Sequence, residues 1–155
     1  MKVSDKLKDL GIELPLPAKP LAAYVPAVIT GNLCFTSGQL PLINGTLLEM
    51  GGKGMVGSVV SKEDAKLAAR VAALNALAAA AAKAGSVDAI KAVVKVTVFV
   101  ASAEGFQEQP FVANGASLFF SEVFGEYGAH ARSAVGVKEL PLGTSVEVEA
   151  IFELN

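Results

Sequence analysis

The sequence predicts an α+β protein in which one β-sheet carries two helices on one face. Strand-like stretches occur in pairs, joined by turn residues, near both ends of the chain. Between these pairs lie a long stretch with helical periodicity, a run of residues with strong β-propensity and a second helical stretch. No linker or shift in composition divides the 155 residues. We therefore expect a single domain over residues 1–155, with the element order β-β-(β)-α-β-α-β-β.

A short helix over Ser4–Leu10 is the first predicted element. Ser4 is a suitable N-cap, because its hydroxyl can accept a free backbone N–H, and Gly11 is a suitable C-terminal stop. An extended arm follows, so that residues 1–22 comprise this helix and the arm. Three prolines in the arm each fix φ and remove a backbone donor: Pro15, Pro17 and Pro20.

Two predicted strands, Tyr24–Thr30 and Leu33–Ser37, come next. Gly31-Asn32 lies between them and has the length and residue types of a hairpin turn. A second turn at Asn44-Gly45, within Leu40–Leu48, predicts a further pair of short strands.

A glycine-rich loop spans Gly51–Gly57 and contains the pattern G-x-G-x-x-G. A dinucleotide site is excluded, because no helix opens within the motif and no acidic residue follows about 20 positions later. A P-loop is excluded because Lys53 is followed by glycine rather than Ser or Thr. We expect a mobile loop, and a position over a ligand cleft remains open.

The longest predicted helix is Ser61–Ala84. Ser61 is its expected cap, Asp64 stands at capping-box distance, and Gly85 ends it. The alanine-rich surface indicates close packing against a sheet. Five residues at helical spacing form the expected apolar stripe: Leu67, Val71, Leu74, Ala78 and Ala81.

After a loop over Ser86–Ala92, the run Val93–Ala101 predicts a strand. Its nearly continuous valines are typical of a central strand covered on both faces. A second helix is expected over Phe111–Phe124, opened by Pro110 and closed by Gly125.

The last quarter of the chain reads as two strands, Ser133–Val137 and Val146–Phe152, joined by the turn Leu140–Gly143. Arg132 stands at the mouth of the first strand and Glu147 lies on the second. On neighbouring strands these two side chains can point into the same space, an arrangement that suits a small anionic ligand.

Composition restricts the functional classes. The net charge is −2 and the basic residues are scattered, so nucleic-acid binding is not favoured. Hydrophobic residues make up 52%, yet no uninterrupted apolar run reaches the ~18 residues of a membrane span. For a chain with so many apolar residues, we expect part of the protein surface to be buried in an oligomer. The single cysteine, Cys34, and the polar N-terminus favour a cytoplasmic protein.

Three groups of residues occur in the order of a known family. From the N-terminus, the first group is Tyr24, Gly31-Asn32 and Thr36–Pro41, and the second is Lys95–Val100. The third is Ala131-Arg132-Ser133 with Leu140-Pro141 and Val146–Glu149. From about Tyr24 onward the chain resembles the YjgF/RidA family, also called endoribonuclease L-PSP. It looks like a longer branch, because of the N-terminal helix and the loop Gly51–Gly57. The resemblance implies a chorismate-mutase-like mixed sheet and a homotrimer with clefts between subunits.

Arg132 and Glu147 are the expected catalytic residues. The planar guanidinium of Arg132 can hold a carboxylate in a bidentate manner, or form a structural salt bridge with Glu126 or Glu139. The resemblance favours the carboxylate of a substrate. It also places Glu147, rather than Glu149, at the position that orients the attacking water.

Six further residues complete the expected substrate site. The resemblance makes Tyr24 a cleft wall near a neighbouring subunit's Arg132, although a hairpin-packing aromatic is the simpler interpretation. Gly38, followed by Gln39, allows a close backbone approach to ligand or marks a β-bulge. Ser133 and Ala134 follow the arginine of the motif, and Ala134 stands where many deaminase members have cysteine. His130 is either a proton donor or a hydrogen-bonded histidine at the start of a strand.

The resemblance implies an enamine/imine deaminase that hydrolyses a small 2-imino acid to a 2-keto acid and ammonia. One histidine cannot build a zinc site, and no metal or organic cofactor is expected. Two alternatives remain. One is a non-catalytic module that binds a keto acid or similar metabolite, and the other is the ribonuclease or translation-inhibitor activity attached to the family's name.

Overall fold

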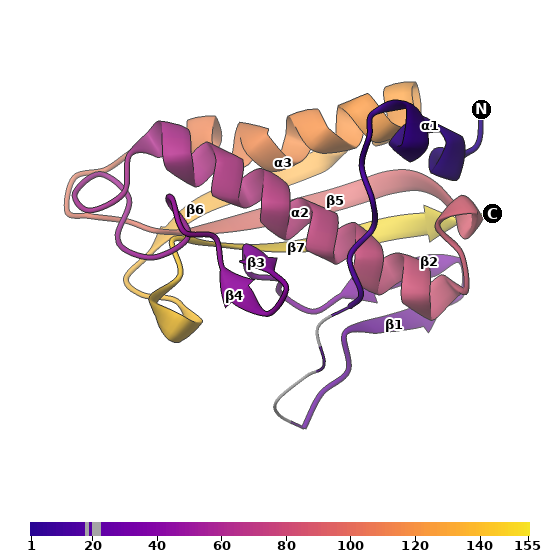
Figure 1. Cartoon of the computed structure of the whole chain (residues 1–155), viewed down its shortest axis with the longest axis horizontal. Helices are drawn as coiled ribbons and strands as arrows, with labels where there is room; N and C mark the ends of the chain where they lie inside the picture. Colours follow the sequence, from indigo (N-terminus) through magenta and orange to yellow (C-terminus); the bar gives the residue numbers. More distant parts are fainter. Residues whose placement is uncertain (18, 20–22) are drawn as a thin grey trace.

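A computed structural model describes residues 1–17, 19 and 23–155 (Figure 1). Five strands form one sheet in the order β1-β2-β7-β5-β6, with only β5 and β6 parallel among these neighbours. Their bounds in that order are Ala27–Thr30, Leu33–Thr36, Val146–Leu154, Ile90–Ala101 and Ala131–Val137. Strands β3 (Leu42–Ile43) and β4 (Thr46–Leu47) form a separate hairpin around the predicted Asn44-Gly45 turn. Pro20, part of the predicted arm, lies outside the described residues.

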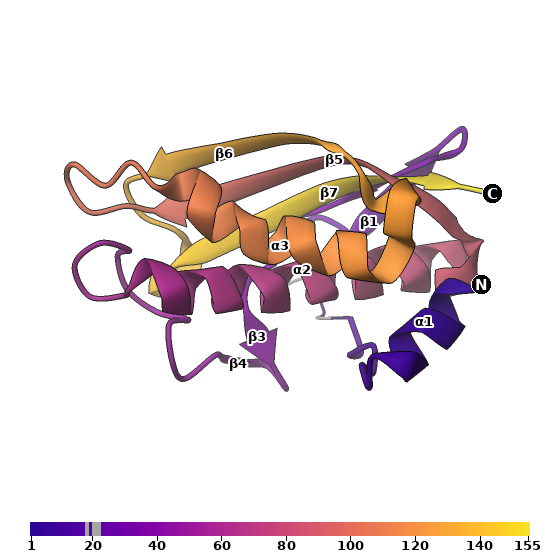
Figure 2. The ribbon, with the colours of Figure 1, turned by 90° about the horizontal axis from the view of Figure 1, so that it is seen from above.

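The predicted α+β architecture is confirmed. Helices α2 (Lys62–Ala84) and α3 (Gln109–Phe124) cover one face of the sheet, and Figure 2 shows the other face free of helices. We call these the covered face and the open face. Alternate side chains of β5 and β7 fill the covered face and are completely buried: Val96, Val98, Val100, Val146 and Val148. The prediction that Val93–Ala101 is covered on both faces was therefore wrong for the isolated chain.

Helix α2 begins and ends as predicted. The Ser61 hydroxyl accepts the Asp64 N–H at 3.1 Å, and Gly85 adopts a left-handed conformation. The predicted apolar stripe was right at Ala78 and Ala81, which are buried, and wrong at Leu67, which is 58% exposed; other alanines and Leu77 complete the buried side. Small alanine side chains allow close approach to the sheet and to α3. By length and composition α2 could cross a membrane, but 67% of its most apolar window is buried in the fold, as in a core helix.

Helix α1 (Val3–Asp9) is held by a residue distant in the sequence. Its N-cap is Lys2, so the prediction that Ser4 caps it was wrong. Instead, the Ser4 N–H and hydroxyl both donate to the Asp88 carboxylate at 2.8 Å. Asp88 thus satisfies a free N–H at the start of the helix, and these hydrogen bonds lower the pKa of Asp88.

The last two strands are not neighbours. Strand β5 lies between β6 and β7, pairing parallel with β6 and antiparallel with β7. The expectation that the two strands joined by the Leu140–Gly143 turn pair with each other was therefore wrong. The short connection between β6 and β7 passes one end of β5. A 3-10 turn at Pro141–Gly143 carries the chain across that end.

The loop Gly51–Gly57 is anchored, in contrast to the mobile loop expected. Thr144 and Ser145, both buried, donate side-chain hydrogen bonds to the Gly52 and Gly51 carbonyls. Val56 is fully buried and its N–H donates to the Ala101 carbonyl at 2.7 Å. Glycine is needed because a Cβ on Gly52 would lie 2.2 Å from the Leu48 carbonyl oxygen. The loop closes one end of the sheet.

Candidate functional site

Arg132 lies on the covered face of the edge strand β6. It pairs in register with Val96, which is buried beneath the helices. Its Nη1 donates to Asn114 Oδ1 at 2.8 Å and to Ser117 Oγ at 3.2 Å. Both partners lie three residues apart on α3 and therefore on one side of that helix. Helix α3 thus holds one nitrogen of the guanidinium.

His130 extends this network. Its Nε2 lies 2.8 Å from Ser117 Oγ, and its Nδ1 lies 2.6 Å from the Gly128 carbonyl oxygen. The imidazole meets the buried ring of Phe120 edge-on, with the ring centroids 6.2 Å apart. His130 is therefore a hydrogen-bonded histidine at the start of a strand, one of the two interpretations that the sequence left open.

The guanidinium of Arg132 keeps one edge without a protein partner. In residues 1–17, 19 and 23–155 no carboxylate lies within 4.0 Å of it, so neither Glu126 nor Glu139 forms the alternative salt bridge. Its hydrogen bonds there involve Nη1 alone. A half-buried cation held by neutral groups can bind a carboxylate from outside the chain.

Glu147 lies on the open face, away from Arg132. It pairs with Phe99, three residues after Val96, so its side chain points to the opposite side of the sheet. A Cβ on Gly38 would lie 2.6 Å from Glu147 Oε1, which shows how closely the carboxylate approaches this glycine. The prediction that Arg132 and Glu147 share one space was therefore wrong within a single chain.

Gly38 belongs to a β-bulge. Phe35 pairs with Ile151, whereas Gln39, which follows β2, pairs with Val148, so the chain has one extra residue on the β2 side between these pairs. The Thr36 hydroxyl takes over part of the ladder by accepting the Ala150 N–H at 3.0 Å. The bulge brings the backbone at Gly38 against Glu147, so the predicted β-bulge is confirmed, and a close approach to ligand stays a prediction.

The charge of Glu147 is disfavoured by its surroundings. Burial raises the pKa of this carboxyl above its ordinary value of 4.5, and the neighbouring Glu149 charge raises it further. A hollow of about 100 Å³ lies beside Glu149 on the open face, lined also by Phe35, Lys95 and Thr97. Lys95 Nζ donates to Ser133 Oγ at 2.9 Å across this face.

The predicted site residues therefore fall into two groups. His130, Arg132 and Ala134 lie on the covered face at or just before β6, and Gln39 pairs with Val148 of the same face, whereas Gly38, Ser133 and Glu147 lie on or beside the open face. Tyr24 precedes β1 and is 54% exposed.

Two residues that contact Arg132, Asn114 and Ser117, were not predicted. Their sequence signal is a pair of polar residues at i and i+3 within the otherwise apolar run 111–120 of helix α3.

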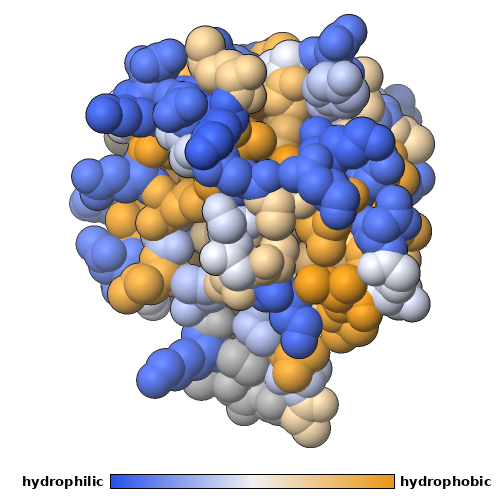
Figure 3. Space-filling model, turned by 90° about the vertical axis from the view of Figure 1, so that its right-hand side faces the viewer, coloured by the Kyte–Doolittle hydropathy of each residue, from blue (hydrophilic) through white to orange (hydrophobic). Residues whose placement is uncertain are grey.

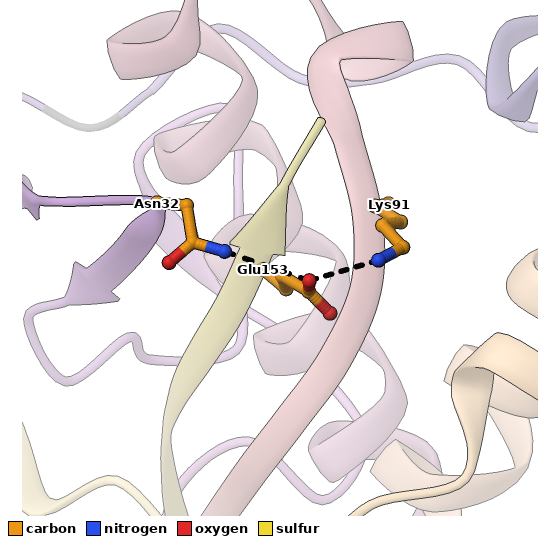
Figure 4. A network of polar contacts seen from close by, with 3 residues as sticks. All are labelled: Asn32, Lys91 and Glu153. Carbon is orange, nitrogen blue, oxygen red and sulfur yellow. Dashed lines mark hydrogen bonds and ion pairs between the residues drawn. The ribbon is translucent and has the colours of Figure 1, made fainter.

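A larger hollow of about 690 Å³ lies at the end where both termini meet. Figure 3 shows this end of the molecule, where hydrophobic and hydrophilic residues are mixed. Two of the charged side chains lining it, Asp88 and Lys91, already have protein partners. Asp88 accepts from Ser4, while Lys91 forms a 2.9 Å ion pair with Glu153, to which Asn32 donates a longer hydrogen bond (Figure 4). This hollow therefore offers less to an anionic ligand than Arg132 does. Within the described residues, no cluster of three His, Cys, Asp or Glu side chains could hold a metal.

Comparison with known proteins places the chain in a family. Residues 16–154 match the family model described as endoribonuclease L-PSP. Protein TCP17 of Trypanosoma cruzi is 44% identical over 99% of this chain and 95% of its own length. A 2-iminobutanoate/2-iminopropanoate deaminase of Dermatophagoides farinae is 31% identical, covering 93% of this chain and 95% of the relative.

A solved structure supports the same assignment. The crystal structure of a putative endoribonuclease from Shewanella oneidensis superposes with a TM-score of 0.93 at 31% identity. The alignment covers 99% of this chain and all of the other. The predicted family and fold are confirmed: the chain belongs to the endoribonuclease L-PSP family, also known as the YjgF/RidA family.

Proposed function

We propose that this protein is an enamine/imine deaminase that hydrolyses small 2-imino acids to 2-keto acids and ammonia. The observation that carries the proposal is Arg132, a half-buried arginine that α3 holds by one nitrogen and that has no carboxylate partner in the described part of the chain. Such an edge binds the carboxylate shared by these substrates and products. One relative, 31% identical, bears the name of this activity.

The separation of Arg132 and Glu147 on two faces of the sheet supports a cleft between subunits. Arg132 and Glu147 point to opposite sides, so one chain cannot present both to a small molecule. The open face also exposes apolar side chains, with Val28, Phe35 and Val135 each 38–50% exposed. We propose that the open faces associate in a homotrimer, in which Arg132 of one subunit meets Glu147 and Gly38 of the next.

In this cleft Arg132 binds the substrate carboxylate and fixes the position of the C=N carbon. Glu147 orients a water molecule and accepts its proton as the oxygen adds to that carbon. The nitrogen of the protonated imine becomes an amine in this addition. It then takes up the proton held by Glu147 and leaves as ammonia, while the added oxygen gives up its remaining proton and the C=O bond of the keto acid forms. The raised pKa of Glu147 strengthens it as a base. Because imines are intrinsically reactive, positioning and electrostatics supply enough acceleration.

The test generates 2-iminobutanoate with an amino-acid oxidase and traps it with semicarbazide. The wild-type protein is expected to compete with the trap, lowering the yield of semicarbazone. Arg132→Ala should lose at least about 100-fold in kcat/KM, since it removes a charge-assisted bidentate contact. Arg132→Lys should lose nearly as much, because an ammonium cannot reproduce the planar fork. An Arg132→Ala protein as active as the wild type would overturn the proposal.

A carboxylate-binding module is the second candidate, favoured by the neutral hydrogen bonds that hold Arg132 without help from Glu147. Calorimetric titration with 2-oxobutanoate separates the two candidates. Binding without competition for the imine would support the module. Ribonuclease activity, suggested by the family's name, is less compatible with a net charge of −2. Incubation with RNA, using Arg132→Ala as the control, tests it directly.

A further inference from the structure

We infer that Ser117 and His130 are positioning residues that orient Arg132 through a one-directional chain of hydrogen bonds. The inference rests on the proposed binding of a carboxylate by Arg132. It concerns two residues that do not need to touch the substrate. The chain runs from Arg132 Nη1 to Ser117 Oγ, from there to His130 Nε2, and from His130 Nδ1 to the Gly128 carbonyl.

The donors and acceptors fix the direction of the first and last bonds, and a neutral imidazole fixes the direction of the bond between them. The Gly128 carbonyl can only accept, so His130 Nδ1 must carry a hydrogen. The guanidinium can only donate, so Ser117 Oγ accepts from Arg132. The single proton of the Ser117 hydroxyl is then free to be donated to His130 Nε2, which accepts it when the imidazole is neutral. Every bond in the chain is satisfied by the neutral Nδ1–H tautomer of His130.

This arrangement decides which edge of Arg132 faces a ligand. Nη1 has two hydrogens, and Asn114 Oδ1 and Ser117 Oγ accept them at 2.8 and 3.2 Å. The remaining donors, Nε–H and the Nη2 hydrogens, lie on the side-on edge of the guanidinium, which matches the two oxygens of a carboxylate. Loss of the Ser117 contact frees the guanidinium to rotate and weakens this preorganisation.

Packing holds the imidazole in place. The ring of Phe120, which is fully buried, contacts His130 edge-on. Asn114 and Ser117 share one side of α3, and His130 and Arg132 are two residues apart where β6 begins. The spacing of a helix on one side and of a strand on the other therefore places the four side chains in a single contact layer.

Nitrogen NMR tests the tautomer without any assay of activity. The protein contains one histidine, so the imidazole ¹⁵N signals of the untagged chain belong to His130 alone. At a pH where the ring is neutral, we expect Nδ1 at the protonated shift and Nε2 at the unprotonated shift. The opposite tautomer, Nε2–H, would overturn the inference. In Ser117→Ala the Nε2 signal should move, since its hydrogen-bond donor is gone.

Kinetics and binding test the positioning role. Ser117→Ala is expected to raise the KM for 2-iminobutanoate, and the Kd for 2-oxobutanoate, about three- to tenfold, while kcat changes less than about twofold. Ser117→Thr keeps the hydroxyl and should restore values close to wild type. Ser121→Ala makes the same change one turn later on α3, at an exposed residue, and serves as the matched control.

Failure of this inference is distinguishable from failure of the proposed function. If the wild type binds 2-oxobutanoate and Ser117→Ala binds it equally well, the positioning role is wrong while the carboxylate site stands. If the wild type neither binds 2-oxobutanoate nor competes for the imine, the proposed function fails and the positioning of a substrate fails with it. A uniform loss of folded protein in Ser117→Ala, with Ser117→Thr no better than Ser117→Ala, would also contradict the positioning role.

Discussion

The covered and open faces of the sheet are built by alternate residues of the same strands, yet their chemistry differs. On the covered face β5 and β7 contribute valines that are completely buried against α2 and α3. On the open face the same strands contribute Lys95, Thr97, Glu147 and Glu149, together with half-exposed apolar residues from β2 and β6. The covered face is thus complete within one chain, whereas the open face retains apolar surface and a carboxylate with a raised pKa.

Arg132 is the exception to this difference in chemistry, because it is a charged residue on the covered face. It lies on the covered side, where a charge is costly, but at an edge strand where α3 supplies neutral acceptors. Glu147 lies on the opposite side with no described basic residue within 4.0 Å. The separation shows that one chain does not bring the two halves of the proposed site together, and we propose that a second chain completes the site.

The largest effect is expected from breaking the open face. Phe35→Asp places a charge on an apolar side chain that is 38% exposed there. Burying an unpaired carboxylate in an interface costs about 3–5 kcal/mol, so we expect monomers and at least a 100-fold loss of imine hydrolysis. Light scattering coupled to gel filtration measures the assembly. Leu67→Asp, at the more exposed outer side of α2, is the control and should stay assembled.

A smaller effect is expected from Gly38→Ala. The added methyl would lie 2.6 Å from Glu147 Oε1, and it displaces the carboxylate because that side chain can move. We expect kcat/KM to fall about 10- to 100-fold with little change in assembly. The same substitution in a Glu147→Gln background should cost much less, because the group that it displaces is already inactive. Equal losses in both backgrounds would show that Gly38 acts independently of Glu147.

The smallest effect concerns stability against pH. The folded chain raises the pKa of Glu147, so it binds the proton more tightly than the unfolded chain does. Wild-type stability therefore falls as the pH rises from the ordinary value of 4.5 through the folded pKa. Glu147→Gln cannot ionise, so its Tm should exceed that of the wild type above this interval and match it below pH 4.5. Glu153→Gln is the control: it removes the ion pair with Lys91, so it should not raise the Tm.

Much of the fold was predictable because local signals and tertiary packing agree. Ser61 and Gly85 mark the ends of α2, and the Asn44-Gly45 turn lies where its residue types require. The insertion of β5 between β6 and β7 was not predictable from the turn at Leu140–Gly143, since strand order depends on non-local pairing. That error placed Arg132 and Glu147 together. The stripe on α2 was predicted only in part: Ala78 and Ala81 are buried, but Leu67 is exposed, because the buried side of this closely packed helix consists mainly of alanine.

The central claim, that two chains complete one site, is tested most directly by mixing inactive subunits. Arg132→Ala and Glu147→Gln proteins are unfolded, combined in equal amounts and refolded together. The account predicts that activity reappears, since an intact Arg132 from one subunit can meet an intact Glu147 from its neighbour at about one in four clefts. Refolding each variant alone is the control and should give no activity. A mixture as inactive as its two components, although assembled, would contradict the account.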